Sequence, residues 1–89
     1  MTFREVMEEY FKSWRLSVRE STSISHKKSF AYQCGELLDL DIIDINKETI
    51  ENHLAEMLSR LAQSTVGHWN ARCKNILEYA YNNRYIESD

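Results

Sequence analysis

The chain has 89 residues, of which 43% are hydrophobic and 28% charged, and its formal net charge is -3. This balance excludes a disordered chain, and the length allows one domain with an adequate core. No apolar run could span a membrane, and the first residues do not resemble a signal peptide, so we expect a cytoplasmic protein without a membrane partner. Proline is absent and only Gly35 and Gly67 are glycines, which favours long helices and predicts an all-α fold.

Charge is segregated along the chain. Residues 12–28 carry a local net charge of +4 and residues 60–84 one of +3, whereas residues 29–59 between them carry -6. A local positive surface can therefore coexist with an acidic whole, and the overall charge does not exclude a polyanion as the partner.

The first helix is expected over residues 3–16, where apolar side chains recur three and four positions apart. Thr2 stands at the N-cap position and Glu5 at the third helical position, which predicts a capping box. The side chains expected to face the core are Phe3, Val6, Met7, Tyr10, Phe11 and Trp14.

A second helix is expected after a polar loop over residues 17–22, with Ser21 or Thr22 as its N-cap. Gly35 either ends this helix as a C-terminal cap or lies inside it, where a glycine costs about 1 kcal/mol relative to alanine. The side chains expected to face the core are Ile24, Phe30, Ala31, Cys34, Leu37 and Leu38.

Residues 38–46 alternate apolar and acidic side chains and could be mistaken for an edge strand. Because no second strand is expected to pair with them, we predict a connector that buries Ile45 and either Ile42 or Ile43. Asn46 is then expected to cap a third helix that is acidic in its first turns. Its inward side chains are expected to be Ile50, Leu54, Met57, Leu58 and Leu61.

The fourth helix is expected over residues 64–82, with Ser64 as its N-cap and a left-handed residue, Asn82 or Asn83, at its end. One side is apolar and consists of Val66, Trp69, Cys73, Ile76, Leu77 and Ala80. The other side has small residues and hydrogen-bond donors, and consists of Thr65, His68, Ala71, Arg72 and Asn75. It has no acid before Glu78, although a merely solvated face in so acidic a chain would carry Glu and Asp.

The order of these motifs resembles the N-terminal core-binding domain of the phage integrases, which are tyrosine recombinases. The matching residues are Thr2, Phe3, Ser21, Thr22, Asp44, Ile45, Ser64, Thr65, Val66, Ala80, Tyr85 and Ile86. The chain departs from the family at His26, where an aromatic residue is common, and at Gly67 and His68, where a polar and then a basic residue are common.

The resemblance implies a SAM-like orthogonal bundle of four helices. Such a domain lies on one side of the recombination-site DNA, while the C-terminal catalytic domain of the same protein grips the other side. The second and fourth helices would face the double-stranded DNA, and these two helices coincide with the two basic segments. We therefore expect a single domain over residues 1–89, a fragment of a longer integrase that is monomeric alone and tetrameric on DNA.

The resemblance also implies that this chain contains no catalytic residue, because the tyrosine nucleophile belongs to the catalytic domain. Tyr79 and Tyr85 are expected to pack in the core or to dock the catalytic domain. His26, His53 and His68 are scattered along the sequence, so no metal and no cofactor are expected.

Twelve residues are candidates for DNA contact because they offer hydroxyls, helix-start N–H groups, amides or cations. They are Ser21, Thr22, Ser25, His26, Lys27, Lys28, Ser64, Thr65, His68, Arg72, Lys74 and Asn75. Arg72 and Asn75 have the geometry for base edges, although phosphate contacts are commoner. Other interpretations compete with DNA contact. Ser21 and Ser64 could serve only as helix caps, and each lysine could be only a solvated surface charge.

Two isolated cysteines, Cys34 and Cys73, are expected to be small core residues in a reducing compartment. A helical protein-interaction module remains an alternative function, which an apolar patch exposing Trp14 or Trp69 would favour. A small helix-turn-helix repressor is a weaker alternative, because the fourth helix is long for a recognition helix.

Overall fold

The computed structural model describes residues 1–14 and 19–87, which form four α-helices and no strand. The elements in chain order are α1 (Phe3–Trp14), α2 (Glu20–Cys34), the 3₁₀ turns η1 (Gly35–Asp39) and η2 (Ile42–Asp44), α3 (Lys47–Leu58) and α4 (Gln63–Asn82). The all-α prediction is thus confirmed for the described residues. None of the described helices combines the length and the apolar character needed to cross a membrane.

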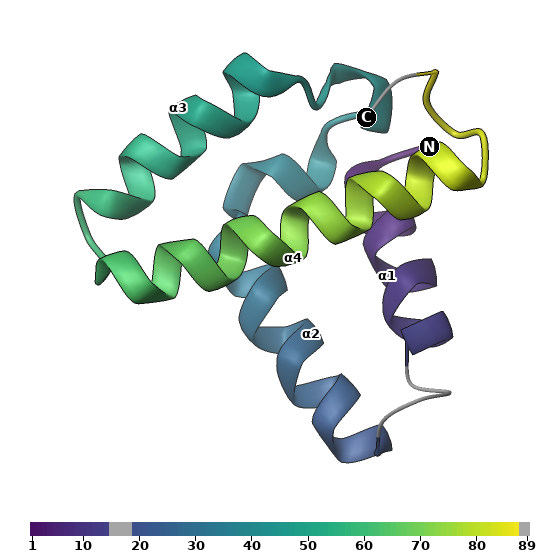
Figure 1. Ribbon diagram of the computed structural model, residues 1–89, viewed down its shortest axis with the longest axis horizontal. Coiled ribbons are helices and arrows are strands. Elements are labelled where there is room, and N and C mark those ends of the chain that lie inside the picture. The colour runs from purple at the N-terminus through teal and green to yellow at the C-terminus, as the bar shows by residue number, and fades with distance from the viewer. Residues whose placement is uncertain (15–18, 88–89) are drawn as a thin grey trace.

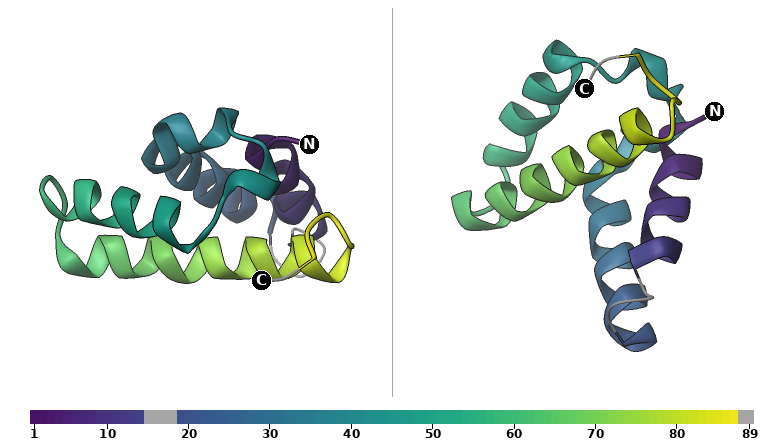
Figure 2. Two further views of the ribbon diagram at one scale, coloured as in Figure 1. Left: turned by 90° about the horizontal axis from the view of Figure 1, so that it is seen from above. Right: turned by 45° about the vertical axis from the view of Figure 1, so that its right-hand side comes forward.

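The four helices form two pairs that cross. Figure 1 shows α1 beside α2, and α4 running across both, with α3 folded back along α4. The two further views in Figure 2 agree, and α4 contacts each of the other three helices. These contacts make α4 the central element of the fold.

One hydrophobic core lies where the pairs cross, and Trp69 of α4 is its largest fully buried side chain. Its indole stacks on Phe30 of α2, with ring centroids 5.5 Å apart, and lies 4.9 Å from the ring of His53 of α3. The indole Nε1–H donates to Sγ of Cys34 over 3.4 Å. Side chains from three helices therefore meet on one ring. The six apolar positions expected to face inward from α4 are all buried, which confirms that prediction.

Two helices begin with the side-chain caps that the sequence predicts. At α1 the Glu5 N–H donates to Thr2 Oγ1 over 3.2 Å, and the Thr2 N–H donates to Glu5 Oε1 over 3.0 Å. These two bonds form the expected capping box. At α3 the Thr49 N–H donates to Asn46 Oδ1 over 2.9 Å, so Asn46 is the N-cap.

The other two helices begin without a side-chain cap. α2 follows Arg19 and α4 follows Ala62, so the predicted caps Ser21, Thr22 and Ser64 are wrong and lie inside the first turns. The first turns of α2 are held by a contact with α1, because the hydroxyl of the buried Ser23 donates to Phe11 O over 3.2 Å. In α4 the N–H of the buried Val66 donates to Ala62 O over 3.1 Å, one turn earlier.

Part of the expected loop before α2 is helical, because that helix already begins at Glu20. The predicted end of the first helix at Leu16 lies outside the described residues. Two residues expected in the core are exposed: 45% of Ile24 and 52% of Leu58 face solvent. The residue that precedes each of them, Ser23 in α2 and Met57 in α3, is buried instead. Packing against the other helices sets how each helix is rotated about its own axis, and this rotation turns Ile24 and Leu58 toward solvent.

The connector between α2 and α3 begins at Gly35, whose φ of 55° makes it the C-cap of α2. This is the first of the two roles predicted for that glycine. Ile42 and Ile45 are buried, whereas Ile43 is 70% exposed. The structure thus decides which of the two neighbouring isoleucines enters the core.

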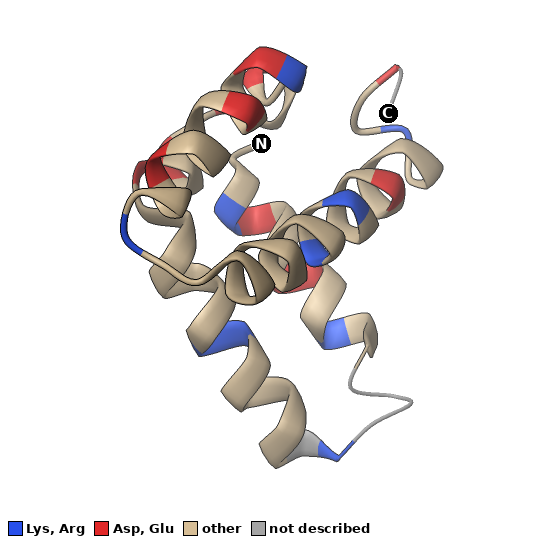
Figure 3. Ribbon diagram, turned by 60° about the vertical axis from the view of Figure 1, so that its left-hand side comes forward, with Lys and Arg blue, Asp and Glu red and all other residues tan. Residues whose placement is uncertain are grey.

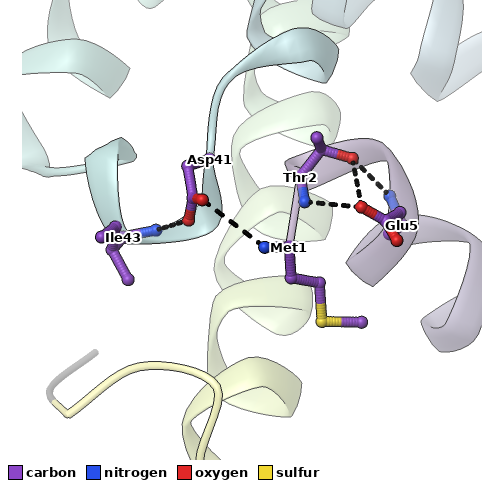
Figure 4. A network of polar contacts seen from close by, with 5 residues as sticks. All are labelled: Met1, Thr2, Glu5, Asp41 and Ile43. Atoms are coloured by element: carbon purple, nitrogen blue, oxygen red, sulfur yellow. Dashed lines mark hydrogen bonds and ion pairs between the residues drawn. The ribbon is translucent and has the colours of Figure 1, made fainter.

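The N-terminal residues pair with this connector, which the sequence did not predict. The Phe3 N–H donates to Leu40 O over 2.8 Å, and the Ile42 N–H donates to Met1 O over 2.8 Å. Figure 4 shows the adjacent Asp41 carboxylate, which accepts from the Ile43 N–H over 3.2 Å and lies 3.5 Å from the amino group of Met1. These bonds hold the start of α1 against the connector.

The end of α4 also differs from the prediction. Asn83 is the C-cap with a φ of -95°, and the left-handed residue is Arg84, with a φ of 63°. Asn83 continues the helical hydrogen bonding instead, because its N–H donates to Tyr79 O over 3.0 Å and its Nδ2 donates to the same oxygen over 2.8 Å. The reversal of the chain is thereby moved one residue beyond the predicted position.

Candidate nucleic-acid interface

A groove of about 560 Å³ runs between α2 and α4, and we call it the α2–α4 groove. Its lining consists of Ser25, His26, Ser29, Phe30 and Gln33 from α2 and His68, Trp69, Ala71, Arg72 and Asn75 from α4. No acidic residue is among them. The polar sides of the two helices that the resemblance assigns to DNA therefore meet in one hollow.

Helical spacing explains how the groove is built. Its α2 positions recur three and four residues apart, as do its α4 positions, so each set occupies one face of its helix. The floor is apolar, because Phe30 and Trp69 stack there with an interplanar angle of 10°. The polar lining residues of α2 and of α4 form the two sides of the groove.

Arg72, the only Lys or Arg among the described residues of the lining, is partly buried against α1. Its guanidinium carbon lies 4.4 Å from the centroid of the Trp14 ring, within the range of a cation–π contact. Its Nη1 donates to the Tyr10 hydroxyl over 3.1 Å, and its Nη2 lies 3.4 Å from Nδ1 of His26. The guanidinium is thus held by residues of α1 and α2. Sequence reasoning did not predict these partners, because Tyr10 precedes Arg72 by 62 residues.

Five of the twelve candidate residues line the α2–α4 groove, namely Ser25, His26, His68, Arg72 and Asn75. Five others lie on α2 or α4 outside its lining, namely Ser21, Thr22, Lys28, Ser64 and Thr65. Sequence reasoning missed Ser29 and Gln33, although their spacing from Ser25 and His26 could have identified them as neighbours on the same face.

The remaining two candidates, Lys27 and Lys74, line different hollows. Lys27 faces a hollow beside α1 that contains Glu5, Glu8 and Glu9. The expectation that the basic side chains of α2 and α4 share one surface is therefore wrong for these two lysines. The reason is helical geometry: residues two apart, such as Arg72 and Lys74, project to nearly opposite sides of a helix.

A second large hollow, which we call the α3 hollow, has a volume of about 1070 Å³. Its apolar lining comes from η2, α3, α4 and the C-terminal segment, and consists of Ile42, Ile43, Ile45, Ile50, Leu54, Leu77, Tyr85 and Ile86. Both signs of charge lie around it, on Lys47, Glu51, Lys74, Arg84 and Glu87. Figure 3 shows that acidic positions gather along α3 and the segment before it, whereas α2 and α4 carry few.

The two thiols belong to the core. Cys34 and Cys73 are both buried and free, and burial raises the pKa of each thiol to about 12. A thiol with so high a pKa is protonated at neutral pH and is a poor nucleophile. The prediction that both cysteines are small core residues is confirmed. Within the described part of the chain, no three His, Cys, Asp or Glu side chains are grouped as metal ligands.

Comparison with known proteins adds no name to this site. No family model, no curated protein and no solved structure matches the chain. The resemblance to integrase core-binding domains thus rests on the sequence motifs.

Proposed function

We propose that this chain is the DNA-binding domain of a phage-type tyrosine recombinase and that it contacts double-stranded DNA through the α2–α4 groove. One observation carries the proposal: the two helices that the motifs assign to DNA contribute acid-free polar faces to the same groove. A groove lined by acids would repel the phosphates, and a groove lined only by apolar groups would leave them without hydrogen bonds.

The lining offers the kinds of groups that bind DNA. Hydroxyls of Ser25 and Ser29 can donate to phosphate oxygens, and the amides of Gln33 and Asn75 suit either phosphates or adenine edges. The exposed first turns of both helices add free N–H groups. Because the whole chain is acidic and Arg72 is the only cation among the described lining residues, we expect weak affinity.

The segregation of charge supports one orientation on DNA. The acids concentrate on α3 and its approach, and the α2–α4 groove has none. A duplex would therefore dock with the groove toward it and α3 away from it. A catalytic domain of the same protein would grip the opposite face of the DNA and supply the cutting chemistry.

The tyrosines of this chain support a structural role here. Burial raises the pKa of Tyr79, and a hydrogen bond to Glu9 raises that of Tyr85. Both shifts are opposite to the lowered pKa that activates a nucleophile. Tyr79 also packs edge-on against Tyr10, with ring centroids 6.0 Å apart.

A protein-binding function would need another surface. Trp69 is only 2% exposed and Trp14 lies under the guanidinium of Arg72, so neither forms the exposed apolar patch that would favour an interaction module. The α3 hollow is the one observation in favour, because Ile43 beside it is 70% exposed.

A matched pair of charge insertions tests the proposal. Ala71 lies in the groove and Ala55 lies on α3, and both are exposed inside a helix. We expect the unmodified chain to bind a short mixed-sequence DNA duplex at low salt with a Kd of about 10⁻⁴ to 10⁻⁶ M, the usual non-specific range. Ala71→Glu should weaken binding by at least about tenfold, and Ala55→Glu by no more than about twofold.

Fluorescence anisotropy with a labelled duplex measures both variants, and circular dichroism verifies their folding. Equal losses from Ala71→Glu and Ala55→Glu would show that net charge alone matters and that the groove is not the contact surface. An unmodified chain that does not bind at low salt would contradict DNA binding itself.

A further inference from the structure

Arg72, the cation that lines the α2–α4 groove, directs its hydrogen bonds to other residues of the protein. Arg72 donates to Tyr10 through Nη1, approaches His26 through Nη2, and covers the Trp14 ring. It also lies 5.5 Å from the ring centroid of Phe11. These contacts with three aromatic rings and a hydroxyl hold the guanidinium in place. It therefore cannot also form a bidentate hydrogen bond with a base edge or a phosphate.

The contact with His26 fixes a tautomer. An arginine has no acceptor and is always protonated, so Arg72 Nη2 is the donor and His26 Nδ1 is the acceptor across the 3.4 Å contact. A neutral imidazole carries one N–H, which must then be on Nε2. The guanidinium therefore decides which ring nitrogen of His26 can donate.

The ring of His26 is also held in place. It packs edge-on against Trp14, with centroids 5.4 Å apart and an interplanar angle of 67°. The side chain is nevertheless exposed at the groove. Within the described part of the chain, no protein group accepts from Nε2, so this N–H is available to a ligand.

We infer that Arg72 is a positioning residue that acts through His26, and that the Nε2–H of His26 is a donor to a phosphate oxygen of the bound duplex. This inference rests on the proposed DNA-binding function and deepens it. It changes the role of Arg72, which the sequence places, together with His26, among the expected contacts to the DNA. In the structure the cation serves to orient a neutral donor.

Four variants of the 89-residue chain, with the labelled mixed-sequence duplex as probe, separate the two roles. His26→Asn places its amide near Nδ1 and should lose about three- to tenfold in affinity, the range of one hydrogen bond. His26→Gln places its amide near Nε2 and should recover part of that loss. Arg72→Lys keeps the charge but loses the planar guanidinium, so it should weaken binding, although by less than His26→Asn, because part of the imidazole population keeps its Nε2–H. The double variant His26→Asn/Arg72→Lys should be no weaker than His26→Asn alone, because both act on one contact.

The salt dependence of binding distinguishes positioning from direct contact. Removing a neutral donor leaves the slope of log Kd against log salt unchanged, whereas removing a phosphate-bound cation lowers it by about 0.9. We expect the unmodified slope both in His26→Asn and in a further variant, Arg72→Gln, which removes the cation. If Arg72→Lys binds like the unmodified chain, or if the losses in the double variant add, the inference is wrong while the proposed function stands. If the unmodified chain does not bind, both are wrong.

A measurement without DNA tests the geometry by itself. The ¹⁵N shifts of the His26 imidazole should report the Nε2–H tautomer in the unmodified chain and a mixture of tautomers in Arg72→Lys. A predominant Nδ1–H form would overturn the inference, whatever the duplex does. Thermal unfolding of each variant, with the exposed Asn52→Ala on α3 as control, verifies that every comparison concerns folded protein.

Discussion

The α2–α4 groove and the α3 hollow are formed on two sides of the same helix, α4, yet their chemistry differs. The groove has an apolar floor, neutral donors and a single cation that is held by aromatic rings. The hollow has apolar walls, and around them charges of both signs. Neighbouring positions on a helix are about 100° apart, so one helix can serve two surfaces.

The difference teaches that charge summed along the chain is a poor guide to charge on a surface. Residues 60–84 are basic as a segment, but only one of their cations, Arg72, lines the groove. Lys74 and Arg84 face the α3 hollow, where Glu51 and Glu87 are close. What distinguishes the groove is therefore the absence of acid more than an excess of base.

The largest effect is expected from a core side chain that contacts both α2 and α3. Trp69→Ala removes the ring that packs on Phe30 under the groove and beside His53 of α3. Removal of a buried tryptophan should lower the free energy of unfolding by about 3 to 5 kcal/mol, a large part of the stability of a small domain. Urea unfolding followed by circular dichroism measures it, with the exposed Tyr81→Ala as control. A loss below about 1 kcal/mol would mean that the two regions do not depend on one core.

A smaller effect is expected from a change confined to the α3 side. Asn46→Ala removes the acceptor of the Thr49 N–H and should cost about 1 kcal/mol in the free energy of unfolding. Duplex affinity should stay unchanged, because the cap lies at the α3 hollow and not in the groove. If the affinity for the duplex also fell in Asn46→Ala, α3 would be part of the binding surface, and the distinction between the groove and the hollow would be wrong.

The smallest effect is expected at an exposed ion pair where α3 ends. Arg60 donates to Glu56 over 2.6 and 3.0 Å, and these bonds lower the pKa of the Glu56 carboxyl. Such a pair stabilises the fold above the carboxyl pKa of the unfolded chain, and its contribution is lost as the pH falls through the lowered pKa. Glu56→Gln should therefore be slightly less stable than the unmodified chain at neutral pH and equally stable in acid. Thermal unfolding at the two pH values measures this, and a difference that persists in acid would assign it to another cause.

The sequence by itself determined that four helices form and which side of α4 is buried. The 3.6-residue period identified all six buried positions of α4, and the Thr2–Glu5 and Asn46 caps were recognisable because a cap depends on residues within one turn. The same reasoning failed at the starts of α2 and α4, which have no side-chain cap, and the first turns of α2 are held by a contact with α1 instead.

Only the tertiary structure decided which polar residues meet. The period of a helix specifies which side chains share a face, but not the rotation and crossing angle at which that face meets another helix. Those depend on how the core side chains of every helix interlock. For this reason His26 and Arg72, separated by 46 residues, come into contact, while Lys74, only two residues from Arg72, faces another surface.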